Sequence, residues 1–144
     1  MGFIFYTLIF VFGTIIGSFL NVVILRLGTG RGLGGRSSCG SCSHTLSWFE
    51  LVPVVSYLSL CGRCRNCSSK ISSQYALVEL LTGVIFVLIA LATPIFSLHA
   101  FVLVATLASI LIVVAVYDLR HMIIPDILVL ILVVLGIFYR LYQL

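Results

Sequence analysis

The chain has 144 residues, of which 62% are hydrophobic and only 8% are charged, and its mean hydropathy is +1.30. A soluble domain carries roughly 25% charged residues, so this composition excludes a soluble globular domain and makes lipid the main solvent. The net charge of +4 is interpreted as membrane topology and attraction to anionic lipid, with no nucleic-acid partner.

Four apolar stretches predict transmembrane helices. The first, residues 3–25, carries no charged side chain and is long enough to cross a hydrocarbon core of about 30 Å. No Lys or Arg precedes Arg26, so the stretch lacks the basic start of a signal peptide and is predicted to be a retained helix. The others are residues 76–92, 98–117 and 127–139, the last reaching 144 if it continues past Arg140. We therefore expect an all-α integral membrane protein with about four transmembrane helices.

The basic residues predict the orientation of these helices. Arg120 follows the third stretch, Arg140 stands alone after the fourth, and the other six lie between the first two: Arg26, Arg31, Arg36, Arg63, Arg65 and Lys70. The positive-inside rule then places the long loop and Arg120 in the cytoplasm and the N-terminus outside. We divide the chain into a first transmembrane helix (1–25), a cytoplasmic cysteine-rich loop (26–75) and further membrane helices (76–144).

All five cysteines lie in the long loop. Cys39 and Cys42 form one Cys-x-x-Cys knuckle, and Cys64 and Cys67 form a second one after residues 43–63. Two such knuckles supply the four thiolates of a tetrahedral zinc site, so zinc is the expected cofactor of the loop. Disulfides are the alternative, but they belong to oxidising compartments and an odd cysteine count pairs poorly. Cys61 also stands in Cys-x-x-Cys spacing with Cys64; we interpret it as a spare thiol, with Cys67 as the preferred ligand.

Small and polar residues inside the apolar stretches, and the segment between the knuckles, indicate how the helices and the loop pack. Gly13, Gly17 and Asn21 share one face of the first helix, which favours close helix packing and an interhelical hydrogen bond. Glu79, near the start of the second helix, is either paired or at the membrane interface. The segment 46–60 is too short and interrupted to span, so it packs under the metal site or lies on the membrane surface.

Asp118 stands at the cytoplasmic end of the third apolar stretch. An ionisable group at such a position is a candidate functional residue, and a solvated boundary residue is the alternative. Several motifs occur in a fixed order along the chain: residues 17–22 with Arg26-Leu27, the two knuckles, residues 48–58, 62–67, 71–72, 75, 78–80 and 118–126. Over residues 13–126 this order resembles the type IV prepilin peptidases.

The resemblance implies a bacterial inner-membrane enzyme with two activities. Members of this family are aspartic endopeptidases that cut the leader from type IV prepilins or type II secretion pseudopilins. They also methylate the new N-terminal amine, with S-adenosylmethionine as the methyl donor. The resemblance makes Asp118 a catalytic residue and assigns the partner aspartate to a Gly-x-Gly-Asp motif. It names no residues for binding S-adenosylmethionine and does not specify an oligomeric state.

The Gly-x-Gly-Asp motif is not in this sequence, whose acidic residues are Glu50, Glu79, Asp118 and Asp126. On a continuous helix Asp118 and Asp126 would lie about 12 Å apart, too far to share a proton. Pro125 breaks such a helix, but a reversal that pairs the two is the less favoured alternative. We therefore expect a truncated family member in which residues 76–144 are helices of an incomplete aspartic peptidase domain. The alternative is a non-catalytic membrane scaffold whose zinc loop binds a pilus or type II secretion partner.

Overall fold

The computed structural model describes residues 2–30, 32–93 and 98–142, and these are helical or irregular, with no β-strand beyond two isolated bridges. The elements are α1 (Gly2–Arg26), the 3-10 helix η1 (Trp48–Leu51), α2 (Val55–Ser59), α3 (Gln74–Ala92), α4 (Leu98–His121) and α5 (Asp126–Tyr142). Among the described residues, α1, α3 and α4 are long and apolar enough to cross a membrane. The fourth expected helix forms as α5, with 17 residues. The all-α membrane fold is confirmed, and α4 extends four residues beyond the expected end.

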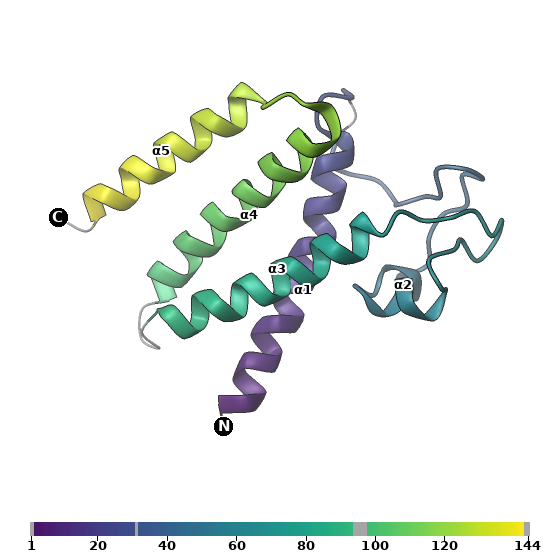
Figure 1. The fold of residues 1–144 in the computed structure, drawn as a ribbon, viewed down its shortest axis with the longest axis horizontal. Helices are drawn as coiled ribbons and strands as arrows, with labels where there is room; N and C mark the ends of the chain where they lie inside the picture. Colours follow the sequence, from purple (N-terminus) through teal and green to yellow (C-terminus); the bar gives the residue numbers. More distant parts are fainter. Residues whose placement is uncertain (1, 31, 94–97, 143–144) are drawn as a thin grey trace.

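Glycines allow α1 and α3 to cross in close contact (Figure 1). A Cβ added at Gly13 would lie 2.8 Å from the Cα of Gly83, and one added at Gly17 would lie 2.7 Å from the Cα of Glu79. Real Cβ atoms do not approach a backbone so closely, so each glycine is required by the crossing. The packing face predicted from Gly13 and Gly17 is therefore confirmed.

A small apolar core joins α4 to this pair of helices. Val113 of α4 is buried against Ile24 of α1 and Val78 of α3. A second cluster forms further along the same helices, where Phe86 of α3 packs near Ala105 of α4. Because most other large apolar side chains on these helices remain exposed, the outer faces suit contact with lipid.

The chain reverses direction between α4 and α5. The N–H of Met122, at a left-handed φ of 54°, donates to the carbonyl of Asp118 (2.7 Å), and α5 starts directly after Pro125. The two helices then run side by side, as Figure 1 shows, and no described residue of α5 is buried. Asp118 and Asp126 consequently stand on either side of one short turn. The sequence analysis disfavoured a reversal that pairs these two residues; the chain does reverse here, but no hydrogen bond joins their side chains among the described residues.

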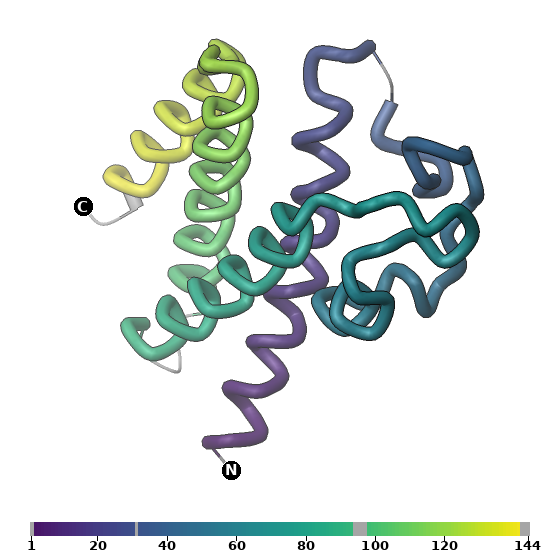
Figure 2. The backbone as a smooth tube through the Cα atoms, turned by 45° about the vertical axis from the view of Figure 1, so that its right-hand side comes forward, coloured from purple at the N-terminus to yellow at the C-terminus, as the bar shows by residue number. Residues whose placement is uncertain are grey.

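One edge of the helix bundle gathers the ends of four helices. The guanidinium of Arg120, in the last turn of α4, donates to the side chain of Gln74 at the start of α3 (2.8 Å). A Cβ at Gly28, just after α1, would come within 3.0 Å of the hydroxyl of Tyr117 in α4. The loop between α1 and α3 leaves and returns at this edge and folds beside the two helices (Figure 2). This edge therefore carries Asp118 and the two ends of the loop that holds the cysteines.

Candidate metal centre and the adjoining pocket

The two cysteine knuckles have the same backbone conformation. In each, the first cysteine donates its N–H to the carbonyl five residues later, and the residue after the second cysteine donates back to the first. These hydrogen bonds, all 2.9 Å, are Cys39 N to His44 O, Ser43 N to Cys39 O, Cys64 N to Ser69 O and Ser68 N to Cys64 O. Ser43 and Ser68 both adopt a left-handed φ of 56°. The repetition shows that Cys64 and Cys67, and not Cys61 and Cys64, form the counterpart of the first knuckle.

The four knuckle sulfurs converge on one point between the two turns. The Sγ atoms of Cys39, Cys42, Cys64 and Cys67 all lie within 4.8 Å of one another. The pairs across the knuckles are close, with 3.8 Å from Cys39 to Cys67 and 4.0 Å from Cys42 to Cys64. Zinc held by four sulfurs at about 2.3 Å separates them by about 3.8 Å, so the cluster could hold such an ion. Cys61 is exposed on the preceding turn and is not one of the four.

Hydrogen-bond donors around the sulfurs favour thiolates. The backbone N–H of Cys42, with help from the Ser69 hydroxyl, lowers the pKa of Cys39 from 9.0 to about 5. The Ser69 side chain also lowers the pKa of Cys67, whose sulfur lies 3.1 Å from the hydroxyl oxygen. The backbone N–H of Cys67 stabilises the Cys64 thiolate, yet burial and the neighbouring thiols raise the pKa of Cys64 above its usual value. Thiolates are the metal-binding form of cysteine, so these contacts prepare the cluster for a cation.

Glu50 ties the first knuckle to η1. Its carboxylate accepts the backbone N–H of Ser47 (2.8 Å) and lies 3.8 Å from Nε2 of His44, which follows the knuckle. Nearby, the guanidinium of Arg65 in the second knuckle lies over the ring of Phe49 (5.2 Å). The segment 46–60 is thus packed beside the metal centre, while Trp48 stays 80% exposed.

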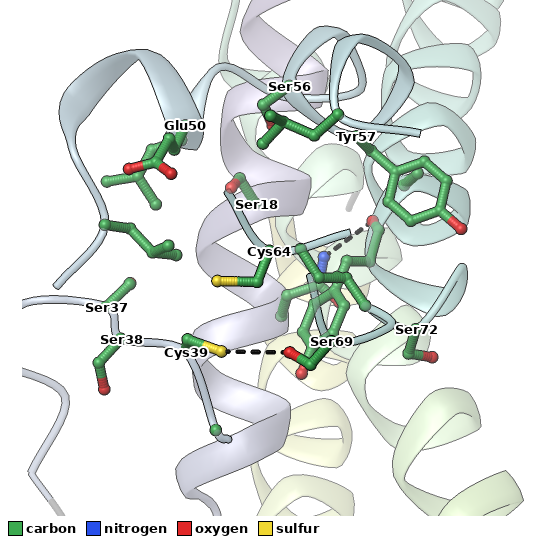
Figure 3. A pocket seen from close by; sticks show the side chains of 18 of the residues that line it. Ser18, Ser37, Ser38, Cys39, Glu50, Ser56, Tyr57, Cys64, Ser69 and Ser72 are labelled. Carbon is green, nitrogen blue, oxygen red and sulfur yellow. Dashed lines mark hydrogen bonds between the residues drawn. The ribbon is translucent and has the colours of Figure 1, made fainter. Parts of the chain in front are cut away.

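A pocket of about 410 Å³ lies between the knuckles and the helices. Figure 3 draws Ser18, Cys39, Cys64 and Ser69 around it, and the rest of its wall comes from α1, the loop, η1, α2 and the start of α3. Asn21 and Glu79 both line this pocket, although the sequence analysis treated Asn21 mainly as a packing residue. Their shared signal in the sequence was a polar side chain inside an apolar stretch, but no pattern there indicated that they face the same cavity.

Asp118 occupies the last turn of α4 and is half-buried. It lies near the two ends of the cysteine loop, but neither Asp118 nor Asp126 lines the pocket. The chain thus holds two separate groups of candidate residues: the four thiols with their pocket, and the aspartates at the α4–α5 turn.

Apolar helices with a four-thiol cluster at one edge define a multi-pass membrane protein with a loop suited to hold a metal ion. The family model described as the Bacterial Peptidase A24 N-terminal domain matches residues 11–93, and the chain belongs to this family. The resemblance to the prepilin peptidases is thereby confirmed.

Curated relatives carry a common name. The prepilin leader peptidase/N-methyltransferase of Myxococcus xanthus is 42% identical over 125 residues, covering 86% of this chain and 37% of that protein. The protein of the same name from Aeromonas salmonicida is 34% identical over 165 aligned positions, covering 96% of this chain and 56% of that protein. The Bacillus subtilis protein of this name is 37% identical over 121 residues, covering 83% of this chain and 48% of that protein. The chain therefore spans between about one third and just over half of the length of these relatives. No solved structure matches significantly.

Proposed function

We propose that this chain carries the zinc loop and the first catalytic aspartate of an enzyme that removes the leader from type IV prepilins or pseudopilins and methylates the new N-terminus. The name of its relatives supports the activity. The observation that supports the proposal for these residues is the convergence of four thiols in a loop whose ends meet the last turn of α4, where Asp118 lies.

Zinc is the proposed occupant of the thiol cluster, held by Cys39, Cys42, Cys64 and Cys67. The sulfur spacing and the donors that stabilise thiolates support this assignment. Four protein ligands leave no open coordination position, so the ion holds the loop in shape and takes no part in the chemistry. Each knuckle is a short hydrogen-bonded turn, and a bound ion would join the two turns and stabilise the fold of the loop.

The proposed location is the bacterial inner membrane, with the cysteine loop and Asp118 on the cytoplasmic side. Six basic residues in the loop and Arg120 beside Asp118 support this orientation. A prepilin has a basic leader followed by an apolar helix, as the family resemblance implies. The junction of these two parts would meet the enzyme at the cytoplasmic edge, where Asp118 lies.

Asp118 is proposed to act in a pair of carboxylates. One carboxylate takes a proton from water, whose oxygen attacks the peptide carbonyl, and the other donates a proton to the carbonyl oxygen. The resemblance assigns the second group to a Gly-x-Gly-Asp motif that residues 1–144 do not contain. Asp126, across the α4–α5 turn, is the second acidic residue at this edge and is the local alternative.

A cleavage assay on prepilin tests the assignment. Residues 1–144 are joined to the region of the Aeromonas salmonicida relative that follows the matched segment, and are also assayed alone. We expect cleavage by the fusion, loss of at least a hundredfold in its Asp118→Asn variant, and little change in Asp126→Asn. A fusion that cuts equally well without Asp118 contradicts the assignment and favours the non-catalytic scaffold that binds a pilus or type II secretion partner. Cleavage by residues 1–144 alone that is lost in Asp126→Asn makes the local pair the catalytic one.

A further inference from the structure

The pocket beside the thiol cluster contains a buried hydrogen-bond acceptor that lacks a partner. Asn21 is only 4% exposed, and its Nδ2 donates to the backbone carbonyl of Tyr75 in α3 (3.0 Å). That carbonyl can only accept, so the amide orientation is determined and Oδ1 is the remaining group. Among buried side-chain atoms of the described residues, this oxygen is the one left without a hydrogen-bond donor. Such an atom costs free energy unless a ligand supplies the donor.

A second acceptor, Glu79, lies on α3 one helical turn after Tyr75, the residue that Asn21 contacts. Glu79 follows Tyr75 by one turn of α3, just as Asn21 follows Ser18 by one turn of α1. The carboxylate of Glu79 is 8% exposed and accepts the backbone N–H of Val54 (2.7 Å) through Oε2. The Ser18 side chain also hydrogen-bonds to this carboxylate. Two carboxylate oxygens accept about four hydrogen bonds, so Glu79 retains capacity for a further donor.

The acidic side chains of the pocket wall are buried, whereas its basic side chains are exposed. The buried members are the carboxylates of Glu50 and Glu79, each 8% exposed. The cationic members, Arg65 and Lys70, are exposed at the rim. An interior lined by acceptors and negative charge favours a cationic ligand that has several N–H donors.

The volume of about 410 Å³ lies within the range of small-molecule and peptide-end sites, roughly 300–1,000 Å³. A primary ammonium group has three donors, which match the free Oδ1 of Asn21 and the remaining capacity of Glu79.

We propose that this pocket binds an α-amino group through Asn21 and Glu79. The proposal rests on the proposed function, which provides two sources of that group: the new amino terminus of the cleaved substrate and the amino group of S-adenosylmethionine. Both present the same donors, so the structure assigns the shared chemistry and the experiment separates the sources. Asn21 and Glu79 act here as binding residues.

Binding is measured on the zinc-loaded chain in lipid nanodiscs, with two matched pairs of probes. The first pair is an apolar peptide with a free amino terminus and the same peptide N-acetylated. The second is S-adenosylmethionine and its 2-oxo analogue, in which a carbonyl replaces the amino group. We expect at least a tenfold preference for the amine in one or both pairs, and the pair that shows it identifies the source.

The variants are Asn21→Leu and Glu79→Gln, with Thr82→Val as the control. Thr82 is buried in the same interface but bonds to Val78 within α3 and does not line the pocket. Both pocket variants should lose the amine preference, and the control should keep it. Glu79→Gln retains the shape and an acceptor for Val54, so it carries the test if Asn21→Leu loses zinc or helicity.

The proposal is overturned if neither probe pair shows an amine preference, or if the preference survives in a folded Glu79→Gln variant. Leader cleavage by the fusion described above is measured in parallel. If cleavage depends on Asp118 while no amine preference is found, only the pocket assignment fails. If the amine preference is found but the fusion does not cut, the proposed peptidase function fails instead.

Discussion

Gly17 of α1 faces the backbone of Glu79 of α3 so closely that a Cβ at position 17 would lie 2.7 Å from the Glu79 Cα. The same contact sets the distance between Ser18 and Asn21 on one helix and the first turns of α3 on the other. Gly17 therefore contributes, with Gly13, to the helix packing and also affects the form of the pocket.

Gly17→Ala should separate α1 from α3 and destabilise the protein by about 1–3 kcal/mol, the usual cost of overpacking. Thermal unfolding in detergent measures the effect. The matched control is Gly136→Ala in α5, where a Cβ meets nothing within 4 Å and alanine favours the helix. Equal melting temperatures for Gly17→Ala and the parent would contradict the close crossing.

Purified protein should contain about one zinc per chain, because four thiolates complete one tetrahedral site. Cys39→Ser and Cys64→Ser should each lower the content sharply, whereas Cys61→Ser should leave it unchanged. Elemental analysis by mass spectrometry provides the measurement. Loss of zinc in Cys61→Ser together with its retention in Cys67→Ser would reverse the assignment of the second knuckle.

In metal-free protein, Cys39 should react with iodoacetamide at pH 6, because its pKa of about 5 leaves it a thiolate there. Cys64, whose pKa is raised, should react much more slowly at that pH. Peptide mass spectrometry after timed labelling distinguishes the two sites, and labelling in guanidinium provides the control, since unfolding removes the difference. Similar rates for both cysteines in the folded protein would show that the hydrogen bonds to Cys39 do not stabilise its thiolate.

The same shift predicts how the stability of the metal-free loop depends on pH. The pKa of Cys39 is lower in the folded state than its ordinary value of 9.0, so its contribution to folding is complete above pH 9. That contribution should decline as the pH falls from 9 to 5 and vanish below the folded pKa. Ser69→Ala removes one hydrogen bond to the Cys39 thiolate and should therefore narrow the pH range over which stability changes. Proteolysis of the loop at a series of pH values measures this range. If the loop instead becomes more resistant to proteolysis as the pH falls through this range, its stability depends on pH in the direction opposite to the prediction.

Cys61 offers a test of orientation, because it is exposed and does not belong to the thiol cluster. An impermeant maleimide should label it in inverted membrane vesicles and not in intact cells. Cys61→Ser identifies the signal, since the proposed zinc would protect the four clustered thiols. Ready labelling in intact cells would place the loop outside and weaken the argument against disulfides.

The helices and the knuckle cysteines were determined by the sequence alone. Length and hydropathy define a membrane span without reference to its neighbours, so the stretches 3–25, 76–92, 98–117 and 127–139 reappear as α1, α3, α4 and α5. The spacing of Cys39, Cys42, Cys64 and Cys67 is equally local, because each pair lies on one turn and needs only one partner turn.

The pocket and the positions of Asp118 and Asp126 relative to each other were decided by the tertiary structure. Asn21 and Tyr75 are 54 positions apart, and their contact depends on which faces of α1 and α3 meet and at what separation. Whether Asp118 and Asp126 share an edge depends on the turn that starts at Met122, where a left-handed residue reverses the chain. Hydrophobic periodicity predicts neither the Asn21–Tyr75 contact nor the arrangement of the two aspartates. Lipid solvates every face of an apolar helix alike, so the fit of side chains selects which helices and faces pack together.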